Sequence, residues 1–141
     1  MADSKTIPNW IYAYIVVFLF IGVWGFNRSV TIEKEAENVF EELKHPLAAT
    51  CIKKDVSNGV IATFSYKEGS VFLLQHYSKE LQSKGWSLFQ TREHLHTTKG
   101  YKSGKYYSYK RGALILILGY DIADQNSYEI KILSQEASIN E

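Results

Sequence analysis

Residues 10–26 read WIYAYIVVFLFIGVWGF and contain no charged side chain. An α-helix rises 1.5 Å per residue, so ~20 residues cross the ~30 Å hydrocarbon layer of a bilayer. Trp10 stands at the start of this stretch and Trp24 near its end, where amphipathic aromatic rings meet lipid headgroups. The stretch therefore predicts a single transmembrane helix over residues 10–27, after an N-terminal tail of residues 1–9.

Three other interpretations of the apolar stretch fit less well. A cleaved signal peptide has an apolar region of ~7–15 residues followed by small residues, whereas this stretch ends Trp24-Gly25-Phe26. A lipoprotein needs a cysteine directly after the apolar run, but the single cysteine is Cys51. A buried soluble helix has one apolar stripe, and here apolar residues occupy the whole circumference. We expect an uncleaved signal anchor.

The segment after the membrane span also has a helical pattern. Ala36, Val39, Phe40 and Leu43 follow the spacing of an amphipathic helix, which Pro46 ends. The pattern predicts a membrane-proximal helix over residues 28–47. Because no strong helix breaker separates it from the span, the two form either one long helix or two helices with a slight bend.

Residues 48–135 have the pattern of an α+β domain. Ser57-Asn58-Gly59 joins two runs rich in β-branched and aromatic residues, and Asn-Gly favours a tight hairpin turn. A helix over residues 70–84 is expected to bury Leu74, Tyr77, Ser78 and Leu81. The expected strands are residues 50–56, 60–66, 86–93, 105–111, 113–120 and 128–134.

These elements predict an α+β fold with an N-terminal single transmembrane helix. The sheet is expected to be mainly antiparallel, with five or six strands covered by two helices. Residues 113–118, ALILIL, predict a central strand that is buried on both faces. Residues 136–141 are expected to form a flexible C-terminal tail.

An amphipathic helix that ends in Gly85-Trp86 and leads into a strand resembles small bacterial envelope domains carried on N-terminal anchors or lipoprotein signals. Phe72, Tyr77 and Leu81 belong to the same pattern, which covers residues 48–134. Those families are largely of unassigned function. The resemblance implies an extracytoplasmic α+β domain and carries no catalytic residue with it.

Composition excludes several classes of function. With one cysteine, the chain has neither an internal disulfide framework nor a cysteine-cluster zinc site. Residues 29–141 carry 14 basic and 14 acidic side chains, since only Lys5, Arg28 and Asp3 lie outside them. This balance is not typical of a nucleic-acid-binding domain, so no nucleic acid is expected as a partner.

Few residue patterns indicate chemistry, and we predict no catalytic residue, no metal site and no cofactor. Cys51 on a strand is expected to be a small core residue. His94 and His96 project from one side of a strand, but a metal site needs three or four convergent ligands. We therefore expect a solvated pair there.

The segment from Thr97 to Tyr120 is the best candidate for binding a partner. It is basic, contains no acidic residue and is rich in tyrosine, which suits contact with an anionic surface. The structural alternative is a strand with cross-strand tyrosine pairs and a solvated lysine edge. The candidate partner-binding residues are Lys99, Tyr101, Lys102, Lys105, Tyr106, Tyr107, Tyr109, Lys110 and Arg111.

Three functions remain open. The first is a non-enzymatic, single-pass membrane-anchored binding or accessory domain, which includes an immunity-type protein that masks a toxin. The others are a small subunit of a larger membrane protein complex and a membrane-tethered metal-dependent hydrolase around His94 and His96. For the first, the expected partners are the lipid bilayer and another protein with an acidic surface, and no small-molecule substrate is identified.

Two opposing arguments concern the side of the membrane on which the α+β domain lies. Lys5 lies before the span, whereas Arg28, Lys34 and Lys44 follow it, which favours a cytoplasmic domain. The envelope-domain resemblance favours export. A difference of one or two charges does not determine the orientation of a membrane span. We therefore follow the resemblance and expect the domain to be extracytoplasmic.

Overall fold

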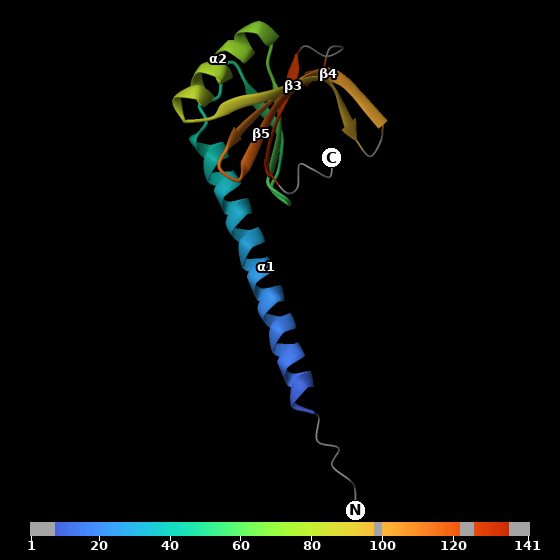
Figure 1. Cartoon of the computed structure of the whole chain (residues 1–141). Helices are drawn as coiled ribbons and strands as arrows, with labels where there is room; N and C mark the ends of the chain where they lie inside the picture. Colours follow the sequence, from blue (N-terminus) through green and yellow to red (C-terminus); the bar gives the residue numbers. More distant parts are fainter. Residues whose placement is uncertain (1–7, 98–99, 122–125, 136–141) are drawn as a thin grey trace, which may run out of the picture. The chain divides into compact units, whose positions relative to one another are not determined.

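A computed structural model of the chain describes residues 8–97, 100–121 and 126–135 (Figure 1). The chain divides into two units, Met1–Ile32 and Glu33–Glu141, and each is described by itself. Most of the expected N-terminal tail and all of the expected C-terminal tail lie outside the described residues.

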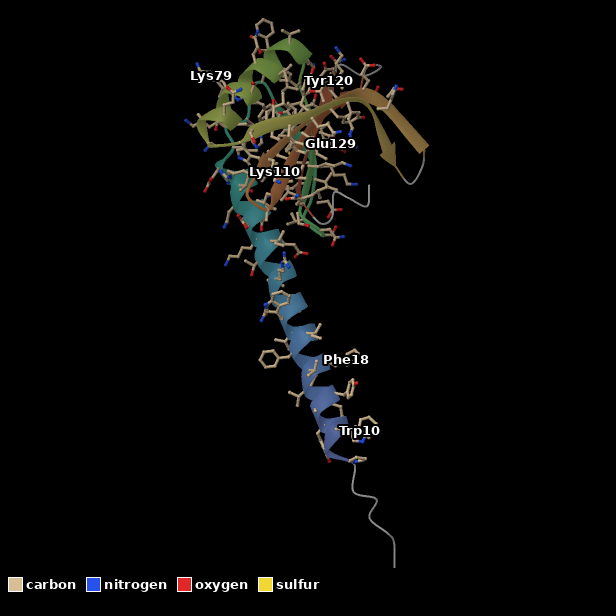
Figure 2. All side chains as sticks on the ribbon, viewed as in Figure 1. Trp10, Phe18, Lys79, Lys110, Tyr120 and Glu129 are labelled. Carbon is tan, nitrogen blue, oxygen red and sulfur yellow. The ribbon has the colours of Figure 1, made fainter. Side chains whose placement is uncertain are left out.

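The first unit is formed by the beginning of α1, a helix of 34 residues over Asn9–Glu42. Its large apolar side chains are exposed, with Phe18 at 75% and Trp10 at 63%, and both project from the helix in Figure 2. The Arg28 guanidinium lies over the Trp24 ring, 5.8 Å from its centroid. Among the described residues, α1 is the one helix that is long and apolar enough to cross a membrane.

The last turns of α1 belong to the second unit. Ala36, Val39 and Phe40 of these turns are buried, as is Leu43 directly after the helix, so the predicted amphipathic stripe is confirmed. The expected membrane span and membrane-proximal helix are one helix, and it ends at Glu42 instead of residue 47.

A six-stranded antiparallel sheet forms the centre of the second unit (Figure 1). The strand order is β1-β2-β6-β5-β4-β3, so β3 to β6 form a meander and β2 of the first hairpin pairs with β6. The antiparallel sheet and the meander are confirmed. The elements are β1 (Thr50–Asp55), β2 (Val60–Ser65), α2 (Ser70–Ser83), β3 (Ser87–Thr97), β4 (Gly100–Arg111), β5 (Leu114–Asp121) and β6 (Ser127–Ser134).

The predicted turn between β1 and β2 contains Gly59 with φ +115°. Side-chain-bearing residues rarely adopt this conformation, and a Cβ at this position would also collide with the backbone oxygen of Ile132. Gly59 therefore fixes the hairpin and lets it pack closely against β6.

One face of the sheet packs against α2 and the last turns of α1 (Figure 1). On the sheet side, buried residues alternate with half-buried ones along β2 and most of β6. Phe64 of β2 contacts Phe40 with ring centroids 6.1 Å apart. The expectation of two covering helices is correct only in part, because α2 is the one helix that lies wholly within this unit.

α2 buries Leu73, Tyr77 and Leu81, while Leu74 and Ser78 are only half-buried. The buried stripe of α2 therefore differs from the predicted one. It contains Leu73 in place of Leu74 and Ser78, so its residues are spaced four apart. β5 lies between β4 and β6 as predicted, and its ALILIL run is buried except for exposed Ala113 and half-exposed Ile117.

A chain of hydrogen bonds crosses the core between the helices and the sheet. The Tyr77 hydroxyl oxygen lies 2.7 Å from Nδ1 of His45 and 2.8 Å from the hydroxyl oxygen of Tyr128. Burial raises the pKa of both tyrosines, so their hydroxyls stay protonated, and burial lowers the pKa of His45. Every member of this network has a partner, as buried polar groups require.

Candidate functional site

The predicted partner-binding segment forms most of β4. Lys99 lies outside the described residues, and so do the side chains of Tyr101 and Lys102. The remaining candidates, Lys105 to Arg111, lie in the part of β4 that pairs with β5 without a register shift.

Alternation along β4 divides these candidates between the two faces of the sheet. Tyr109, opposite Leu116, faces the helices and is 1% exposed, whereas Tyr106, opposite Gly119, faces the other way and is 2% exposed. Lys105 and Lys110 are exposed but lie on opposite faces. The described candidates therefore lie on two faces of the sheet, and a partner role stays a prediction for all nine candidate residues.

Other candidates in this segment have structural contacts. The Tyr107 and Tyr120 rings stack across β4 and β5 with centroids 6.5 Å apart, which is the cross-strand pair of the structural alternative. The Arg111 guanidinium lies 4.9 Å from the centroid of the Trp86 ring, and it donates a hydrogen bond to the carbonyl oxygen of Lys84.

Two further sequence candidates lie on the edge strands. Cys51 is exposed and not part of the core, because β1 is an edge strand whose six residues are all exposed. His94 is exposed on β3, after a register shift that follows Arg92, and the side chain of His96 is not described. Within the described ranges, no three His, Cys, Asp or Glu side chains come together as metal ligands.

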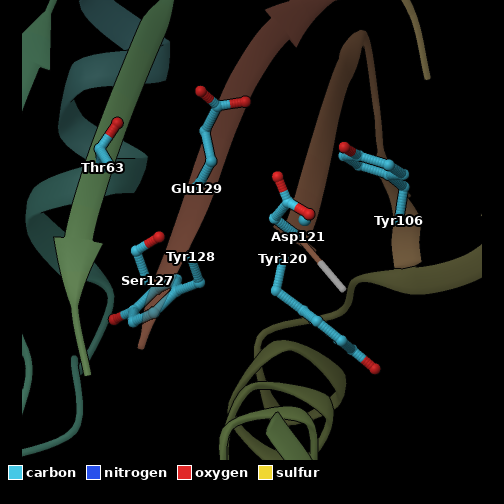
Figure 3. Close-up of a pocket in the computed structure, with 8 residues that line it drawn as sticks. Thr63, Tyr106, Tyr120, Asp121, Ser127, Tyr128 and Glu129 are labelled. Atoms are coloured by element: carbon cyan, nitrogen blue, oxygen red, sulfur yellow. The ribbon is translucent and has the colours of Figure 1, made fainter. Parts of the chain in front are cut away.

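A cavity of about 200 Å³ opens on the face of the sheet that is turned away from the helices (Figure 3). It lies over one row of paired residues, in which β2, β6, β5 and β4 contribute Thr63, Glu129, Gly119 and Tyr106. The residues that line the cavity are Thr63, Tyr106, Gly119, Tyr120, Asp121, Ser127, Tyr128 and Glu129.

The Tyr106 ring forms one wall of the cavity because two glycines leave room for it. A Cβ on Gly119 would lie 2.5 Å from Cδ1 and 2.6 Å from Cε1 of Tyr106, so this edge of the ring lies directly against the β5 backbone. A Cβ on Gly104 would lie 2.9 Å from the Tyr106 hydroxyl oxygen. The ring thus leans back along β4 toward Gly104, whose partner on β5 is Asp121.

The Tyr106 hydroxyl is buried and has no hydrogen-bond partner among the residues that the structure describes. In Figure 3 it points into the cavity, toward the side where Asp121 and Glu129 stand. Burial raises the pKa of this hydroxyl, and the negative charges of Glu129 and Asp121 raise it further. The group is therefore a neutral hydroxyl that faces two carboxylates.

A positive charge also lies near Glu129, one of the residues that line the cavity. Nζ of Lys131 is 3.8 Å from Oε1 of Glu129, two residues earlier on the same face of β6. This long ion pair leaves Glu129 with further capacity to accept hydrogen bonds, because a carboxylate has about four lone-pair positions.

Tyr106 is one of the partner-binding residues that the sequence predicts, as part of a basic, tyrosine-rich segment. Gly119, Asp121 and Glu129 were not predicted. The available signal was the pair of glycines within strand patterns, since such a glycine often marks a close approach. Comparison with protein-family models, curated proteins and solved structures gave no match for this chain. The chemistry of the site therefore rests on its own geometry.

Proposed function

We propose that the chain is a single-pass membrane protein whose α+β domain binds a partner and has no enzymatic activity. The membrane part is supported by the exposed apolar side chains of α1 from Trp10 to Phe26. Aromatic rings at both ends of this stretch fit the two membrane interfaces.

The observation that carries the binding role is the cavity on the face of the sheet that is turned away from α2. A packed domain normally pairs its buried polar groups, but the Tyr106 hydroxyl is left unpaired where it faces a cavity. Exposed Lys110 lies on the same face, where it is suited to contact an acidic group of a partner protein.

The anchoring role is tested by alkaline carbonate extraction of the full chain from membranes. The wild-type chain is expected to stay in the membrane pellet. Replacing Phe18 and Ile21 by Arg adds about 2.5–3.5 kcal/mol per residue to insertion at the helix centre, so this variant should be released. The matched control places two arginines at exposed Asn38 and Glu42 of α1, and it should stay in the pellet. Release of the wild-type chain contradicts the proposal.

We also propose that the α+β domain lies outside the cytoplasm, on the strength of the envelope-domain resemblance and against the count of flanking lysines and arginines. A reporter that is active only outside the cytoplasm, fused after Glu141, should be active. Activity of a cytoplasm-only reporter at the same position reverses the assignment without affecting the anchoring role.

A further inference from the structure

One buried polar atom in the wall of the cavity has no hydrogen-bond partner among the described residues. Two buried side-chain polar atoms in the described part of the chain have no partner, Nε1 of Trp86 and the hydroxyl oxygen of Tyr106, and Tyr106 is the one that lines the cavity. Leaving a buried hydroxyl unpaired costs free energy that a bound ligand can recover.

The charges of the walls define what that ligand must carry. Asp121 and Glu129 lie on the same face as Tyr106 and, when ionised, can only accept hydrogen bonds. The Tyr106 hydroxyl can accept one as well. A group with several N–H donors and a positive charge can donate to each of the three. The Lys131 ammonium, 3.8 Å from Oε1 of Glu129, shows that this carboxylate already pairs with a group of this kind.

The size of the cavity sets a second condition. Its volume of about 200 Å³ is below the ~300–1,000 Å³ of sites for drug-sized ligands, so it suits a small molecule or a single side chain. The wall is fixed in place, because Gly119 holds the Tyr106 ring against the β5 backbone. A compact ammonium group fits this arrangement better than a planar guanidinium group.

We propose that this cavity binds a primary ammonium group, donated by a small amine or by a lysine side chain of a partner protein. The inference rests on the proposed binding function and names the chemistry that the site recognises. The ammonium donates hydrogen bonds to Asp121, Glu129 and the Tyr106 hydroxyl. A lysine from a partner would bring that protein onto the face of the sheet that is turned away from α2, where Lys110 also lies.

The first experiment measures the thermal unfolding of the full chain in detergent micelles. The probes are propylamine, Nα-acetyl-lysine amide and, as the neutral match, its Nε-acetylated form. A ligand that binds the folded state alone raises the melting temperature with its concentration. We expect a rise with a cationic probe and none with the neutral match. A rise with propylamine indicates a small-amine site, and a rise with the lysine amide alone indicates a site for a protein side chain.

The second experiment assigns binding to the cavity. Tyr106→Phe and Glu129→Gln should each raise the Kd for the cationic probe at least ~10-fold. Without a probe, Tyr106→Phe should melt at the same temperature as the wild type or higher, because it removes an unpaired hydroxyl. The control is Tyr66→Phe, because the Tyr66 hydroxyl donates to Glu68 and Tyr66 is not one of the residues that line the cavity, and it should keep wild-type affinity.

Several results overturn the proposal. They are no response to either cationic probe, an equal response to the neutral match, a response to Ca²⁺ alone, or wild-type affinity in both Tyr106→Phe and Glu129→Gln. If Tyr106→Phe does not fold, Glu129→Gln alone decides, because Glu129 is half-exposed. Carbonate extraction uses no ligand, so failure of amine binding and failure of the anchoring role are distinguished.

Discussion

Replacing Tyr77 by Phe is expected to destabilise the fold strongly, although it removes a single oxygen atom. That oxygen lies 2.7 Å from Nδ1 of His45 and 2.8 Å from the hydroxyl oxygen of Tyr128. Tyr77 is 0% and Tyr128 2% exposed, so water cannot replace the hydrogen-bond partner that the Tyr128 hydroxyl loses. A hydrogen bond contributes ~0.5–1.5 kcal/mol and a buried unpaired group costs ~1–3 kcal/mol, which together predict a loss of about 2–4 kcal/mol.

The assay is urea and thermal unfolding of the full chain in micelles. A loss of 1 kcal/mol lowers the melting temperature of a domain near 100 residues by ~4 °C or more, so a drop of about 10 °C or more is expected for Tyr77→Phe. The matched control is Tyr66→Phe, since the Tyr66 hydroxyl donates to exposed Glu68 at 3.2 Å. The control should lose less than ~1 kcal/mol. A loss below ~0.5 kcal/mol in Tyr77→Phe, or an equal loss in both variants, refutes this account of the core.

Two further predictions concern packing and pH. Gly119→Ala should cost ~1–3 kcal/mol of unfolding free energy, because its Cβ would overlap the Tyr106 ring. The control Gly22→Ala, which has open space around it, should cost nothing. Equal effects of the two substitutions in urea unfolding would contradict the close approach of Tyr106 to Gly119. The pKa of His45 is lowered in the fold by burial, with opposing effects of Glu41 and His76, so the unfolded chain binds more protons as pH falls through the ordinary value of 6.5. Stability should be full above this pH and decline below it, and His45→Asn should flatten this part of the profile measured by unfolding at several pH values.

Local signals in the sequence predicted most of the elements. Asn58-Gly59 marks the first hairpin, and the turn at Arg111-Gly112 separates β4 from β5, as expected. Period-two and period-four patterns then identify strands and helices without knowledge of the whole fold. The boundary errors lie where a strand continues into polar residues: β3 reaches Thr97, and β4 begins at Gly100, where apolar alternation is weak.

The candidate site could not be predicted in the same way, because it is created by pairing between distant strands. Thr63, Glu129, Gly119 and Tyr106 form one row only after β2, β6, β5 and β4 assemble in register. A shift of one residue would turn every one of these side chains to the other face. Tyr106 and Tyr107 are adjacent on β4 and have different roles, because their side chains lie on opposite faces of the sheet.

Two buried tyrosine hydroxyls on opposite faces of this sheet call for different explanations. The hydroxyl of Tyr77 has two partners, so the packing of the core accounts for it. The hydroxyl of Tyr106 has no partner in the described part of the chain, and a phenylalanine would fill the same space on Gly119 without the cost of an unpaired donor. Stability therefore gives no reason for an oxygen at this position. A ligand that meets Tyr106 together with Asp121 and Glu129 does give one, and the opposite signs expected for Tyr77→Phe and Tyr106→Phe test that difference within one fold.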